Sequence, residues 1–122
     1  MFAKPILVVD DEPIVRETIR DWLINAGYES VTAESGEQAL GMIANQDFGV
    51  IVLDLKLPGK SGLEVLKKIK AAKPQIKSVI ISVYSSSWLA VEAMKLDTVD
   101  YLVKSVELND LETLILKTLT EV

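Results

Sequence analysis

Three consecutive acids follow an apolar run near the start of the chain, in the stretch ILVVDDEP. Asp10, Asp11 and Glu12 carry like charges. Such charges repel by about 1 kcal/mol at ~4 Å in water and by several times that near a protein surface. A bound cation offsets the repulsion, and hard carboxylate oxygens select Mg²⁺ or a similar ion such as Mn²⁺. The cluster therefore predicts a cation site.

Three more polar residues come at or near the ends of apolar runs further along the chain. Asp54 follows VIVL, Ser82 lies within VIISV and Lys104 ends YLVK. A cation held by few carboxylates keeps some of its water ligands and usually bridges to a phosphoryl group. A hydroxyl and an ammonium are suitable partners for the oxygens of such a group. The glycine-rich cradle expected of a nucleotide site is absent after the first run. A carboxylate that accepts the phosphoryl group covalently fits better, and Asp54, central among these groups, is the predicted acceptor.

Short apolar runs alternate with helical patterns five times. The unbroken, β-branched runs at 5–9, 50–53 and 79–83 indicate parallel strands covered on both faces. The half-polar run at 28–34 and the short one at 101–104 favour the sheet edges. The pattern predicts an α/β fold: a doubly wound, five-stranded parallel sheet in the order 2-1-3-4-5, with five helices on both faces. Its ligand site lies at the carboxyl ends of the first and third strands, where the acids fall.

Helix signals fill the gaps between these runs. Pro13 suits a first helical turn and Gly27 a helix end. Capping boxes begin the second and third helices, with the pairs Ser35–Gln38 and Ser61–Glu64. The apolar face of the first helix is predicted to consist of Ile14, Val15, Ile19, Trp22, Leu23 and Ala26. That of the fourth consists of Leu89, Ala93 and Met94, and that of the fifth of Leu108, Leu111, Ile115 and Leu119.

Composition bounds the class of protein. The 122 residues suit one domain, and 49% apolar and 25% charged content is that of a soluble globule. No apolar run approaches the ~20 residues of a membrane span, and the first residues, MFAKP, are too short for a signal peptide, so a cytoplasmic location is expected. Having no cysteine or histidine excludes disulfides, His-based acid–base chemistry and His-ligated zinc. The net charge of −5 argues against direct nucleic-acid binding.

Four segments together resemble the signature segments of bacterial response-regulator receiver domains, over essentially the whole chain: ILVVDDEP, VIVLDLKLPGKSGLEVL, VIISVYSS and DYLVKS. The resemblance implies a two-component signalling switch that catalyses only its own phosphorylation and dephosphorylation. Asp54 would accept a phosphoryl group from the phosphohistidine of a sensor histidine kinase or phosphotransfer protein, or from a small phosphodonor. Mg²⁺ (or Mn²⁺) would be held by Asp11, Asp54 and the backbone carbonyl of Lys56, with Asp10 acting through water.

The resemblance also assigns roles near the end of the chain. Lys104 would contact the phosphoryl oxygen, Ser82 would hydrogen-bond to it and report its presence, and Tyr101 matches the aromatic that swings inward. The output face would comprise the fourth helix, the strand at 101–104 and the fifth helix. It would meet a downstream effector domain or protein, or a second copy of the chain in a homodimer. Residues 1–122 would form one receiver domain, either complete or trimmed from a longer regulator.

Four positions depart from the usual pattern of the family. Lys104 precedes Ser105 where proline is usual, and Asp97-Thr98 stand where Gly-Ala is usual. Val83 fills a position typical of a small residue, and Ser82 is the less common hydroxyl. None of these departures removes a chemical group, so phosphorylation remains the favoured interpretation. The first three bear on the geometry of switching.

Other interpretations stay open. Taken singly, the acids are typical of a helix start, and Asp54 of a turn after a strand. A receiver that signals by contacts alone would not need the complete set of acids, serine and lysine. An aspartate-nucleophile phosphatase places a second Asp two residues after the first, where this chain has Glu12 or Pro13. A flavin carrier of the same fold would meet repulsive acids at its phosphate loop.

Overall fold

A computed structural model gives the structure of the protein and describes residues 4–54, 62–82 and 100–103. Five strands form one parallel sheet in the order β2-β1-β3-β4-β5. The strands are β1 (Ile6–Val9), β2 (Ser30–Ala33), β3 (Val50–Asp54), β4 (Lys77–Ser82) and β5 (Asp100–Val103). The helices described are α1 (Pro13–Asn25), α2 (Gly36–Asn45) and α3 (Gly62–Ala72). The predicted α/β fold with a parallel sheet is confirmed, and the half-polar β2 lies at a sheet edge, as expected.

Some predicted features lie outside the described residues. These are the fourth and fifth helices, the Ser61 end of the second capping box, and the departures at Val83, Asp97-Thr98 and Ser105. None of the helices in the described part of the chain is long and apolar enough to span a lipid bilayer.

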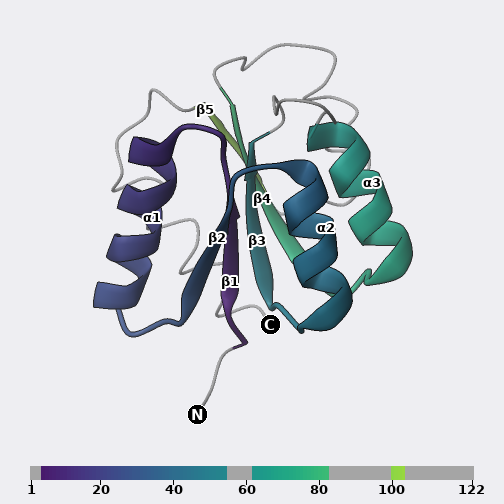
Figure 1. The fold of residues 1–122 in the computed structure, drawn as a ribbon, viewed down its shortest axis with the longest axis horizontal. Helices are drawn as coiled ribbons and strands as arrows, with labels where there is room; N and C mark the ends of the chain where they lie inside the picture. The colour runs from purple at the N-terminus through teal and green to yellow at the C-terminus, as the bar shows by residue number, and fades with distance from the viewer. Residues whose placement is uncertain (1–3, 55–61, 83–99, 104–122) are drawn as a thin grey trace.

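Helices cover both faces of the sheet, with α1 on one side and α2 and α3 on the other (Figure 1). Successive strand residues alternate between two buried clusters, because neighbouring side chains point to opposite faces. The cluster on the α1 side consists of Ile6, Val8, Ile19, Leu23, Val50, Val52, Val79 and Ile81. The cluster on the other side includes Leu7, Val9, Ala39, Ile43, Ile51, Leu53, Leu66, Ile69 and Ile80. Burial on both faces explains why β1 and β3 are unbroken apolar runs.

The predicted apolar face of α1 is correct at its centre and wrong at its ends. Ile19 and Leu23 are buried, whereas Ile14 is 82% exposed and Ala26 is also exposed. At about 100° per residue, Ile14 points roughly opposite to Leu23, away from the sheet. Arg16 takes a place on the buried stripe instead, three and seven positions before Ile19 and Leu23.

Gly27 ends α1, as the sequence predicts. Its φ of +98° turns the chain back toward β2, a backbone conformation that glycine adopts readily. The Gly27 N–H donates to the Ile24 carbonyl at 3.0 Å, and the Tyr28 N–H donates to the Leu23 carbonyl at 3.0 Å. These two bonds satisfy carbonyls of the last helical turn. Tyr28 packs against the same core cluster as Leu23, which fixes the path into β2.

Ser35 caps α2, and its oxygen accepts a hydrogen bond from the Gln38 N–H at 3.2 Å. The side-chain oxygen of Gln38 accepts from the Glu34 N–H at 2.8 Å. The predicted capping box is therefore present with one change: Gln38 reaches one residue further back than Ser35.

Ser78 in β4 is fully buried, and its oxygen has no hydrogen-bond partner within the part of the chain that the structure describes. We expect Ser78→Ala to raise the free energy of unfolding by about 1 kcal/mol, because it removes a buried polar group that gains no bond on folding. Ser35→Ala is the matched control, since it removes a hydroxyl that does cap a helix, and it should lower stability by about 1 kcal/mol. Urea denaturation measures both changes. A loss of stability in Ser78→Ala would contradict this account.

Candidate functional site

The strand register brings Asp10 and Asp54 side by side. Val9 in β1 pairs with Leu53 in β3, so the next residue on each strand falls at the same edge of the sheet. Both acids lie on the side that α1 covers, because the residues two places earlier belong to that cluster. Asp10 is 0% exposed and Asp54 is 2% exposed. Two carboxylates buried this close together are costly to keep ionised without positive charge nearby.

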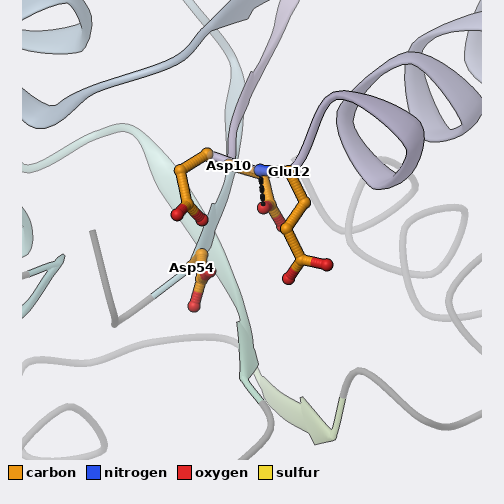
Figure 2. Close-up of side chains that lie close together, drawn as sticks. Asp10, Glu12 and Asp54 are labelled. Atoms are coloured by element: carbon orange, nitrogen blue, oxygen red, sulfur yellow. Dashed lines mark hydrogen bonds between the residues drawn. The ribbon is translucent and has the colours of Figure 1, made fainter. Parts of the chain in front are cut away.

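Four acids gather at this edge and are called here the acidic cluster: Asp10, Asp11, Glu12 and Asp54. Each offers one carboxylate oxygen, and these oxygens all lie within 4.8 Å of one another. Figure 2 shows Asp10, Glu12 and Asp54 grouped where β1 and β3 end. Mg²⁺ binds oxygen at about 2.0–2.1 Å, so two of its ligands are separated by at most ~4.2 Å. The donor type and the spacing fit one hard cation after small side-chain adjustments.

Asp10 is anchored by the turn that follows β1. Its N–H donates to the Ala33 carbonyl at 3.3 Å, and its side-chain Oδ1 accepts from the Glu12 N–H at 2.9 Å (Figure 2). α1 begins at the next residue, Pro13. Asp11 and Glu12 are exposed, whereas Asp10 and Asp54 are buried, so the cluster is accessible from the Asp11 side.

Arg16 contacts the same turn, and the sequence reasoning missed it. Its Nη1 donates to the Asp10 carbonyl at 2.9 Å. Its Nη2 lies 3.8 Å from a Glu34 carboxylate oxygen and 3.9 Å from one of Glu17. The signal that could have identified it is its spacing, which places a cation on the buried stripe of α1 one turn after the acids. Glu12 also belongs to the acidic cluster, although the family resemblance assigns it no role as a metal ligand.

The other predicted site residues are described in part. Ser82 ends β4, opposite Val103, and it follows Ile81, which is the partner of Asp54. Tyr101 lies in β5 opposite Ile80. For these two residues the structure describes the backbone only. Lys104 and Lys56 lie outside the described residues. The structure thus brings Asp10, Asp11 and Asp54 together and sets the end of β4 at the same edge, whereas the roles of all these residues stay predictions.

The family model for the response regulator receiver domain matches residues 6–116. The transcriptional regulatory protein ZraR of Escherichia coli (strain K12) is 37% identical over 118 residues, which cover 93% of this chain and 26% of that protein. This chain therefore spans about a quarter of that relative's length.

Solved structures of response regulators share the fold, and two of them bear on the site. The response regulator protein TrrA from Thermotoga maritima, in complex with Mg(2+)-BeF, is 37% identical with a TM-score of 0.82, and the match covers 95% of this chain and 99% of that one. A response regulator protein from Burkholderia pseudomallei, with a phosphorylated aspartic acid, calcium ion and citrate, is 26% identical with a TM-score of 0.84. That match covers 97% of this chain and 69% of the other.

Proposed function

Since the chain belongs to the response-regulator receiver family, we propose that it is a two-component signalling switch whose phosphoacceptor is Asp54. The observation that carries this proposal is the position of Asp54: it is 2% exposed, ends a central strand and has three other carboxylates beside it. A carboxylate so placed is held in one orientation, which favours attack on a phosphorus atom presented from the open side. The related protein from Burkholderia pseudomallei, which contains a phosphorylated aspartic acid, supports this chemistry.

The acidic cluster would hold Mg²⁺ or Mn²⁺ through Asp11, Asp54 and the backbone carbonyl of Lys56, with Asp10 acting through water. When bound, the cation offsets the negative charge of the carboxylates and of the incoming phosphoryl oxygens. The spacing of the oxygens, all within 4.8 Å, supports a single ion. So does the Mg(2+)-BeF complex of the related TrrA protein.

The Asp54 oxygen would form a bond to phosphorus while the bond between phosphorus and the donor nitrogen or oxygen breaks. Lys104 and the Ser82 hydroxyl would contact the phosphoryl oxygens, and Tyr101 would move inward when Ser82 engages them. The strand order supports this arrangement, because β4 lies beside β3 and β5 lies on the other side of β4.

The switch would work between two partners in the cytoplasm. A sensor histidine kinase or phosphotransfer protein would supply the phosphoryl group, and a downstream effector domain or protein would respond. The output face would be formed by the fourth helix, β5 and the fifth helix. The same face would offer the contact for a homodimer. Residues 1–122 would form one receiver domain with five helices, and the domain would act on no separate substrate. The transcriptional regulators among its relatives support an effector that follows the domain.

Intact-mass spectrometry tests this function directly. We expect incubation with acetyl phosphate and MgCl₂ to add one phosphoryl group to the chain, and hydroxylamine to remove it, since acyl phosphates react with this nucleophile. The same incubation with EDTA should give no added mass. A chain that gains nothing with Mg²⁺ present would overturn the proposal, and a gain that resists hydroxylamine would point to an acceptor other than a carboxylate.

A further inference from the structure

We propose that Arg16 is a positioning residue for the cation site: by holding the carbonyl of Asp10, it orients Asp11 as a ligand. This inference rests on the proposed function of the acidic cluster. It assigns a role to the buried guanidinium of Arg16, which takes no part in the phosphoryl transfer itself.

The peptide bond between Asp10 and Asp11 links the position of one residue to the direction of the next. The carbonyl of Asp10 and the N–H of Asp11 belong to one rigid plane, so fixing the carbonyl fixes the direction in which the chain enters Asp11. Arg16 Nη1 donates to that carbonyl at 2.9 Å. The preceding peptide is also held, because the Asp10 N–H donates to the Ala33 carbonyl. Because Asp11 is exposed, the direction of its carboxylate is set through its backbone.

Arg16 is well placed to act as a rigid support. It shares the buried stripe of α1 with Ile19 and Leu23, which pack into the core on that side of the sheet. Its side chain is only 11% exposed, so few rotamers are open to it. The planar guanidinium offers several donors in a fixed geometry. Its Nη1 donates to the Asp10 carbonyl, while its Nη2 lies near the carboxylates of Glu17 and Glu34.

The same guanidinium connects two neighbouring loops. Its Nη2 lies 3.8 Å from Glu34, the residue that precedes the Ser35 cap of α2. Because the Glu34 side chain is 72% exposed and the separation is long, this ion pair is weak. The bond to the Asp10 carbonyl, which is buried, is the contact that matters for the site.

The test measures Mg²⁺ affinity separately from stability, by following backbone amide resonances in ¹H–¹⁵N spectra during titration with MgCl₂. We expect Arg16→Gln to weaken Mg²⁺ binding about tenfold, which is the lower end of the range seen when a supporting contact of a metal ligand is removed. The Asp11 amide resonance should already be displaced in the metal-free variant. Arg16→Lys should recover part of the affinity, since an ammonium can still donate one bond to the carbonyl.

Two controls separate positioning from other effects. Arg20→Gln makes the same charge change one turn later on α1, where Arg20 pairs with Asp21 at 2.9 Å, and it should leave Mg²⁺ affinity unchanged. Leu23→Ala, or the milder Ile19→Val, lowers stability through the core and should also leave the affinity unchanged. Arg16→Gln binding Mg²⁺ within about twofold of the parent, or core variants weakened as much as Arg16→Gln, would overturn the positioning role. A parent chain that binds no Mg²⁺ would overturn the cation site itself.

Discussion

Replacing Asp54 with asparagine is expected to abolish phosphoryl incorporation completely. The amide has nearly the same shape as the carboxylate but lacks the anionic oxygen that attacks phosphorus. Asp54 is also the acid that ends the central strand β3, beside the acidic turn of β1 and next to β4. The other acids of the cluster should therefore not replace it as acceptor. Intact-mass spectrometry after incubation with acetyl phosphate and MgCl₂ gives the result directly.

Two matched variants sharpen this test. Asp10→Asn alters the buried carboxylate beside Asp54 and should still accept one phosphoryl group when Mg²⁺ is saturating. Asp47→Asn changes an exposed aspartate that pairs with Lys73 at 3.3 Å, away from the acidic cluster, and should be labelled like the parent. One added phosphoryl mass that persists in Asp54→Asn would show that another residue is the acceptor.

The juxtaposition of Asp10 and Asp54 was predictable because it depends on backbone topology. The carboxyl ends of parallel strands lie at the same edge of a sheet, and the half-polar strand at 28–34 prefers a sheet edge, which favours the strand order 2-1-3-4-5. Once β1 and β3 are neighbours in register, the acids that follow them must meet. No side-chain detail is needed for this inference, which is why it could be made from strand ends alone.

Arg16 and Ile14 show where the same reasoning fails. A search for apolar spacing treats arginine as a surface residue and isoleucine as a core residue, yet Arg16 is 9% exposed and Ile14 is 82% exposed. α1 begins close to the acidic turn, so its first buried position faces polar backbone rather than core. A long cationic side chain fills that position because it can lie along apolar surface and place its donors at a carbonyl. The burial of Arg16 and the exposure of Ile14 depend on where α1 meets the sheet, and hydrophobic periodicity alone does not give that position.

Removing the carboxylate of Asp11 is expected to make phosphorylation strongly dependent on added Mg²⁺. Asp11 is an exposed member of the acidic cluster, and its oxygen lies within 4.8 Å of one from each of the other three acids. Without it, the cation has fewer anionic ligands, and the charge of Asp54 and of the incoming phosphoryl group is less well offset. A metal supplies several kcal/mol of such stabilisation, so at limiting Mg²⁺ the rate should fall about tenfold or more in Asp11→Ala.

The measurement is the initial rate of phosphoryl incorporation by intact mass, over a series of Mg²⁺ concentrations. The parent and Asp11→Ala should differ most at low Mg²⁺ and approach one another as the ion is raised, because added cation compensates for weaker binding. Glu37→Gln removes an acid from the exposed first turn of α2 and should follow the parent curve, which controls for the change in net charge. Equal rates in the parent and Asp11→Ala at limiting Mg²⁺ would remove Asp11 from the cation site. A rate in Asp11→Ala that stayed low at every Mg²⁺ concentration would instead mean that Asp11 acts on the acceptor geometry and not through ion affinity.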